Sequence, residues 1–196
     1  MYNILKIQKT VKKYMDSGRF EHTLGVMYTS AALAMCYQED MEKAQVAGVL
    51  HDCAKCMPDA KKLKICKKHG IEISELEASS PYLLHGKVGA FLAKEKYGIE
   101  DEDILNAITY HTTGRPDMSK LEKIVYIADY MEPHRNKASN LTDVRNMVFK
   151  DLDLTLFKIM SDTLVYLRRS SQGMDPMTVR AYEYYKSRLL QKEKEV

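Results

Sequence analysis

The sequence of 196 residues has no tryptophan and only four cysteines, five prolines and nine glycines. Four cysteines are too few for the disulfide framework of a small secreted domain, and they suit a reducing compartment. With so little proline and glycine, and with 45% apolar and 29% charged residues, the chain is not collagen-like, low-complexity or wholly disordered. A chain of this length is expected to fold as one domain with a sizeable core.

Long apolar runs and an excess of one charge are also missing. At the start of the chain, Lys6, Lys9, Lys12 and Lys13 interrupt every apolar stretch, which excludes a signal-peptide core and a membrane span there. Thirty Lys and Arg against 27 Asp and Glu leave a net charge of +3, too even a balance for a nucleic acid to be the expected partner. We therefore expect a cytoplasmic protein that binds neither nucleic acid nor membrane.

Apolar residues recur at helical rather than strand spacing along almost the whole chain. Ile4, Ile7 and Val11 repeat every three or four residues, as do Leu152 and Leu156. The prolines lie where this pattern breaks, and no run of residues favours a sheet. The pattern predicts an all-α protein with helices over residues 2–16, 20–37, 40–56, 59–69, 74–79, 85–97, 101–112, 118–131, 140–148, 151–170 and 177–193.

A polar pair, His51-Asp52, follows the apolar run Ala44–Leu50 in a segment predicted to be helical. Buried polar groups need partners. Adjacent helical residues point about 100° apart, so an imidazole nitrogen and a carboxylate oxygen can converge on one ion between them. Lys55, one turn further on, is a point charge suited to phosphate. Taken alone, the pair fits a salt-bridged aspartate beside a core histidine equally well.

Two more polar residues occupy inward-facing positions. His111 continues an apolar stripe through Ile104 and Ile108, and Asp129 directly follows the apolar run Ile124–Ala128. A buried carboxylate favours a cation or a metal partner. Imidazole suits Fe, Mn, Co, Ni or Zn, and the sequence does not choose among them. The residues that offer nitrogen and oxygen ligands to one divalent metal are His22, His51, Asp52 and Asp129.

The order of these residues resembles the HD-domain superfamily of metal-dependent phosphohydrolases. Longer motifs resemble the YqeK-type symmetrical bis(5'-nucleosyl)-tetraphosphatases within it: Arg19–Thr23, Leu50–Lys55, His85–Ala90, His111–Gly114 and Tyr126–Arg135. The departure is Cys53, where the family often carries an aliphatic residue. The resemblance implies a single HD-type helical bundle over 1–196, with a core of about 19–145 on which the helices over 151–193 pack.

The resemblance also implies roles for individual residues. A metal ion, with iron as the favoured occupant and Mn, Co or another divalent metal as alternatives, would be held by His22, His51, Asp52 and Asp129. One firmly bound ion is expected, and a second is left open. His85 and His111 would either complete a second metal site or contact substrate phosphates, and we favour phosphate contact. Further phosphate or ribose contacts are implied for Lys55, Thr112 and Arg135, with Arg19 and Arg145 as weaker candidates.

The polar segment before the last helix, Ser170-Ser171-Gln172-Gly173, is a further candidate for binding a base or a ribose. A plain loop with a helix cap explains it equally well.

The reaction implied by the resemblance is hydrolysis of diadenosine tetraphosphate, and of related dinucleoside tetraphosphates, in the middle of the phosphate chain to give two ADP. Asp52 would orient the attacking water or accept its proton, and His85 or His111 would assist the leaving phosphate. Two alternatives remain: an HD phosphohydrolase acting on another nucleotide, such as an alarmone or a dNTP, and a nucleotide-binding module without turnover.

Three other features have simpler interpretations. Cys53 and Cys56 are expected to be packing thiols of one helix rather than a redox pair. Lysines at 61, 62, 64, 67 and 68 are expected to form a solvated basic face. Tyrosines at 182, 184 and 185 are expected to pack the final helix with their hydroxyls in water, and a homodimer contact through them is left open.

Overall fold

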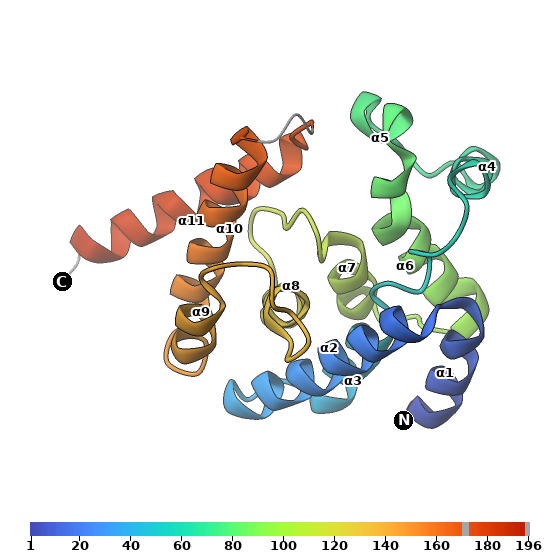
Figure 1. Ribbon diagram of the computed structural model, residues 1–196, viewed down its shortest axis with the longest axis horizontal. Helices are drawn as coiled ribbons and strands as arrows, with labels where there is room; N and C mark the ends of the chain where they lie inside the picture. Colours follow the sequence, from blue (N-terminus) through green and yellow to red (C-terminus); the bar gives the residue numbers. More distant parts are fainter. Residues whose placement is uncertain (170–172, 195–196) are drawn as a thin grey trace.

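A computed structural model describes residues 1–169 and 173–194, and all regular structure in those ranges is helical, as expected (Figure 1). The α-helices are α1 (Ile4–Val11), α2 (Ser17–Cys36), α3 (Met41–Leu50), α4 (Asp59–His69), α5 (Glu75–Ser79), α6 (His85–Tyr97), α7 (Glu102–Tyr110), α8 (Lys120–Met131), α9 (Leu141–Met147), α10 (Leu152–Arg169) and α11 (Pro176–Lys194). Short 3-10 helices follow α1 (η1, Lys12–Tyr14) and precede α6 (η2, Pro81–Leu84).

Polar side chains placed just before several helices satisfy their first free amides. Asp16 accepts a hydrogen bond from the amide of Arg19 at the start of α2, and Asp40 accepts one from the amide of Lys43 at the start of α3. At the start of α8, Ser119 and Glu122 form a reciprocal capping box. These caps fix where the helices that carry the histidines and aspartates begin.

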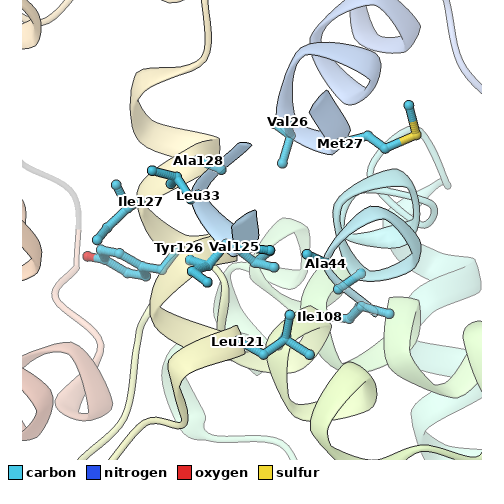
Figure 2. Packing of buried hydrophobic residues seen from close by; sticks show 14 of the residues in the cluster. Val26, Met27, Leu33, Ala44, Ile108, Leu121, Val125, Tyr126, Ile127 and Ala128 are labelled. Atoms are coloured by element: carbon cyan, nitrogen blue, oxygen red, sulfur yellow. The ribbon is translucent and has the colours of Figure 1, made fainter. Parts of the chain in front are cut away.

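The core surrounds α8, which packs against α2, α3 and α7 on one side and against α10 on the other (Figure 1). Side chains from four helices meet there, including Val26 of α2, Ala44 of α3, Ile108 of α7 and Val125 of α8 (Figure 2). These side chains are almost entirely buried. Because eight of its twelve residues are buried, α8 forms the axis on which the other helices are assembled.

The predicted helix over 40–56 is wrong in its second half. The α-helix ends at Leu50, and the following segment up to Cys56 makes tight turns, with the amide of Cys53 bonded to the carbonyl of Leu50 and the amide of Lys55 to that of Asp52. Pro58 disfavours helical backbone only at Met57, so the helix ends well before the position that the proline excludes. His51 and Asp52 therefore lie in a turn after α3 rather than on a helix face.

Two of the surface and thiol predictions are also corrected. Lys62 is buried, with its ammonium 2.7 Å from a carboxylate oxygen of Asp59, so it does not belong to the solvated basic face. Cys56 is exposed, and its thiol lies near Asp16 rather than in a helix packing contact. Cys53 is half-buried against the backbone of Gly89, and the two thiols are free.

Of the three tyrosines of α11, Tyr185 is buried, and Tyr182 and Tyr184 are half-buried. Tyr182 stacks on Phe157 of α10, with ring centroids 5.5 Å apart. The hydroxyl of Tyr185 accepts a hydrogen bond from the buried amide of Met118. The expectation that this hydroxyl lies in water is therefore wrong. Within the described residues, no helix is both long enough and apolar enough to cross a membrane.

The crossing of α2 and α3 generates a prediction about Gly48. A Cβ atom at Gly48 would lie 2.8 Å from the Cα of Met27, so the Gly48→Ala variant has to push two backbones apart. We expect a loss of about 1–3 kcal/mol of unfolding free energy, measured by urea denaturation. Gly18→Ala is the matched control, because its Cβ would meet no atom closer than 3.5 Å. Equal stability of the two variants would contradict the close approach.

Candidate metal centre and active site

Six ionisable side chains converge beside the core, delivered by five different helices or turns. His22 comes from α2, the pair His51-Asp52 from the turn after α3, and Asp129 from α8. The other two are His85, the first residue of α6, and His111, which directly follows α7. The structure therefore brings together all the residues expected to bind metal or to act in catalysis.

Asp52 lies between two pairs of histidines, His22 with His51 and His85 with His111. Its Oδ2 atom lies 3.5 Å from Nε2 of His51 and 3.9 Å from Nε2 of His22. Its Oδ1 atom lies 3.4 Å from Nε2 of His85 and 3.5 Å from Nε2 of His111. The two last-named nitrogens are 3.2 Å apart. The carboxylate is 3% exposed, so four imidazoles and one buried charge share a single site.

Asp129 lies next to the first of these pairs, His22 and His51. Its Oδ1 atom lies 2.9 Å from Nε2 of His22 and 3.7 Å from Nε2 of His51. Burial alone would raise the pKa of Asp129, but the hydrogen bond with His22 and the charge of Arg135 hold that pKa well below its usual range. The carboxylate is therefore ionised at neutral pH.

The pKa of Asp52 is also lowered. Burial raises it, but His51 and His111 at its two oxygens outweigh burial and hold the pKa well below the usual range. Both carboxylates of the cluster thus carry negative charge at neutral pH.

The backbone fixes the tautomers of three of the histidines. In His51, His85 and His111 the Nδ1 atom lies 2.7, 2.8 and 2.7 Å from the carbonyl oxygen three residues earlier. A carbonyl only accepts, so each Nδ1 donates its hydrogen there. The Nε2 lone pair of each ring is consequently directed into the cluster, as a metal ligand requires.

Glu132 and Gly25 determine the orientation of the fourth histidine, His22. His22 donates from Nδ1 to a carboxylate oxygen of Glu132 at 3.1 Å, and Glu132 is 1% exposed. A Cβ atom at Gly25 would collide with the other oxygen of Glu132, so only glycine leaves room for the carboxylate beside α2. Glu132 also accepts hydrogen bonds from the amide and the Nδ1 atom of His134. A carboxylate behind a histidine orients the ring as a metal ligand.

The donor set fits a divalent metal ion. The Nε2 atom of His51 is buried and has no hydrogen-bond partner among the described residues. Ligand atoms lie within 4.8 Å of one another in two groups, His22 with His51 and Asp129, and His51 with Asp52 and His111. Neutral imidazoles with ionised carboxylates are the ligands that Fe, Mn, Co, Ni and Zn accept. The protein can therefore hold a metal at this position.

Three cations surround the cluster. Arg19 donates to Asp52 at 2.7 Å and Arg135 donates to Asp129 at 2.6 Å. Their side chains are 30% and 41% exposed, so they form the mouth of the site. The ammonium of Lys55 lies 3.2 Å from Nε2 of His85, and burial lowers the pKa of this lysine. The site thus combines an anionic interior with a cationic entrance.

The remaining candidates lie away from these contacts or outside the described residues. Arg145 donates to the backbone carbonyls of Met131, Glu132 and Arg135, so it supports the turn after α8. Thr112 is half-buried next to His111 in the chain. Gly173 lies against Leu76 of α5. Ser170, Ser171 and Gln172 lie outside the described residues.

Glu132 and Gly25 are the functional residues that the sequence analysis missed. A signal for Glu132 was present, because a carboxylate at the C-terminal end of a helix opposes the helix dipole and therefore needs a partner. No comparable signal marks Gly25, since its role depends on a side chain 107 residues further along the chain.

Comparison with known proteins gives one family. The family model described as "HD domain" matches residues 19–134. The chain is 38% identical over 174 residues to a protein of Bacillus subtilis named "Bis(5'-nucleosyl)-tetraphosphatase, symmetrical", covering 89% of this chain and 92% of that protein. It is 36% identical over 185 residues to a protein of the same name from Staphylococcus aureus, covering 93% and 94% of the two chains.

A solved structure has the same fold. It is described as a predicted HD superfamily hydrolase involved in NAD metabolism, from Clostridium acetobutylicum. The TM-score is 0.91 at 42% sequence identity, covering 96% of this chain and 99% of that one.

The buried contact between Glu132 and His22 generates a prediction about metal affinity. Glu132→Ala leaves the His22 ring unoriented, so we expect metal affinity to fall about 10- to 100-fold, measured with Mn²⁺ or Co²⁺ against a chromophoric chelator. Glu132→Gln keeps a hydrogen-bond acceptor for His22 and should lose less metal affinity than Glu132→Ala. His134→Ala, which removes only an exposed neighbour of Glu132, is the control. Wild-type affinity in Glu132→Ala would show that the carboxylate does not orient His22.

The burial of His85 generates a prediction about pH. Burial and the neighbouring His111 lower its pKa from 6.5 to about 3. Below about pH 6.5 the unfolded chain binds a proton that the folded, metal-free protein excludes, so stability falls with pH by about 1.4 kcal/mol per unit. Between pH 7 and pH 5 the wild type should lose about 2 kcal/mol more than His85→Gln in urea denaturation.

The exposed His69 provides the control for this measurement. His69→Gln should follow the wild-type pH dependence. If the stability of His85→Gln falls between pH 7 and pH 5 by as much as that of the wild type, His85 is not held neutral in the folded protein.

Proposed function

The chain belongs to the HD domain family, and we propose that it is a metal-dependent hydrolase that cleaves diadenosine tetraphosphate, and related dinucleoside tetraphosphates, symmetrically into two ADP. The observation that carries this function is the buried, ionised Asp52 between four imidazoles, with three cations around it. The extent of the likeness to the two bacterial relatives named above supports the choice of substrate.

We infer that the ligands of the metal are His22, His51, Asp52 and Asp129. Iron is the proposed occupant, with manganese or cobalt as substitutes, since nitrogen and oxygen ligands without thiolate accept all three. When bound, such an ion lowers the pKa of coordinated water and polarises phosphoryl oxygens. His85 and His111, on the other side of Asp52, are assigned to the substrate.

The cations bind and position the polyphosphate. Arg19 and Arg135 pair with the two carboxylates that are also assigned to the metal. With a metal ion on these carboxylates, the guanidinium groups of Arg19 and Arg135 would be free to bind phosphate oxygens through two hydrogen bonds each. Lys55 adds a point charge at His85, on the inner side of the site. Charge that builds up on the phosphoryl oxygens is thereby neutralised at fixed positions.

Asp52 is the proposed base of the reaction. Its pKa is held well below neutrality, so it is ionised and can orient a water molecule or accept its proton. His85 has a pKa of about 3 in the protein without substrate and is therefore neutral at pH 7. We assign to Thr112 a hydroxyl contact with a phosphate oxygen, and to His85 and His111 contacts that form once their Nε2 atoms carry a hydrogen, as donation to an anionic oxygen requires. Proton donation to the leaving ADP requires that the substrate's negative charge first raises the pKa of this histidine pair.

Product analysis tests the function. Purified protein is incubated with diadenosine tetraphosphate and with iron, manganese or cobalt in turn, and the products are separated by chromatography. ADP as the sole product is expected. AMP with ATP would mean that the phosphate chain binds in another register, and absence of any product would favour another HD substrate or a binding module.

Asp52→Asn tests the proposed base. We expect turnover to fall at least about 1,000-fold, because both the negative charge and the proton acceptor are lost. Metal content measured on the same sample separates loss of the base from loss of the ion. Asp143→Asn, on the exposed face of α9, is the matched control and should keep wild-type turnover. Near-normal activity in Asp52→Asn would refute this assignment.

A further inference from the structure

A cavity of about 610 Å³ lies beside the metal centre, between α2, the turn after α8, and the end of α9. Its volume falls within the range of about 300–1,000 Å³ that is usual for small-molecule sites. Arg145, expected from the sequence as a weaker candidate for phosphate or ribose contact, is among its lining residues, and the reaction steps above do not use the cavity.

The lining of the cavity is apolar with a few polar groups. Leu24, Met131 and Pro133 contribute apolar surface, and the aromatic rings of Tyr28 and Phe149 stand at its edge. These two residues are 62% and 53% exposed, so their rings are accessible to a ligand. Glu21, Thr29 and His134 supply hydrogen-bonding groups. Aromatic faces with a few polar groups are the chemistry that binds a base and a ribose.

The cavity and the metal centre share a wall. Gly25 and His134 line the cavity, and both contact the buried carboxylate of Glu132. Glu132 in turn accepts the hydrogen bond from His22. Arg135, the residue after His134, reaches Asp129. A molecule in this cavity therefore lies one side chain away from a metal ligand and next to a cation at the mouth of the site.

We propose that this cavity binds one of the two nucleosides of the dinucleoside tetraphosphate, with its base against Tyr28 or Phe149. This proposal rests on the proposed function. Cleavage in the middle of a symmetrical substrate places one nucleoside on each side of the reacting phosphates, and the cavity next to the metal centre can hold one of them. Stacking on an aromatic face is tolerant of base identity, so adenine and guanine are both accepted.

Arg145 shapes this compartment without being needed to bind the substrate. Its guanidinium group donates to three backbone carbonyls of the segment Met131–Arg135, which forms one wall of the cavity. It is therefore a positioning residue for the wall, and the base is held by the rings opposite.

Binding measurements test the proposal independently of turnover. The probes are a diadenosine tetraphosphate whose central bridging oxygen is replaced by methylene, and inorganic tripolyphosphate, which has no nucleoside. The Tyr28→Ala, Phe149→Ala double variant should bind the methylene analogue about tenfold more weakly and tripolyphosphate within twofold of wild type. KM for diadenosine tetraphosphate should rise by a similar factor, with kcat within twofold.

Tyr166→Ala is the matched control, because Tyr166 is an exposed aromatic residue on α10 that does not line the cavity. Unchanged affinity of the double variant for the methylene analogue would overturn the proposal, as would an equal loss for both probes. A change of molecular mass in sedimentation with unchanged affinity would identify the cavity as a contact between copies and also overturn it. A wild type that binds the analogue but forms no ADP would instead refute the proposed function alone.

Discussion

The carboxylate of Asp52, buried among four imidazoles, is the interaction on which the rest of the site depends. An ionised group that is 3% exposed is unstable unless positive charge or hydrogen-bond donors surround it. Here the guanidinium group of Arg19 donates to one oxygen from the entrance, and each oxygen also faces two inward-directed Nε2 atoms, a set of ligand atoms that suits a bound cation. The helices that carry those groups must therefore end or cross at one point, which is why α2, α3, α6, α7 and α8 all converge on it.

The histidines are aligned by the helical backbone itself. Three of the four rings donate to a carbonyl three residues earlier, so the local helical turn determines both the tautomer and the direction of each ring. The fourth, His22, lies within a long helix whose own carbonyls are bonded, and it uses the carboxylate of Glu132 instead. Because the Nδ1 atoms of these rings are bonded to the protein, the Nε2 atoms face inward, and a cation bound there would stabilise the fold.

Much of this arrangement could be predicted from the sequence, and the exceptions have physical causes. Apolar spacing located the helices, since burial of one face repeats every three or four residues. The same spacing continues past Leu50, so it could not show that tight turns replace the helix at His51. The inward position of Lys62 was also hidden, because a long aliphatic stem allows a lysine to be buried next to one carboxylate. Contacts between distant segments, such as that of Glu132 with Gly25, cannot be predicted until the fold is known.

The ion pairs of Arg19 with Asp52 and of Arg135 with Asp129 give the centre a second way to balance its charge. The two guanidinium groups neutralise the carboxylates when no divalent cation is bound. The fold therefore does not depend on a continuous supply of metal to balance these charges. Under the proposed function, chains without metal would stay folded during metal shortage and would become active when the ion returns, without new synthesis. The level of activity in a cell would follow the availability of metal more closely than the abundance of the protein.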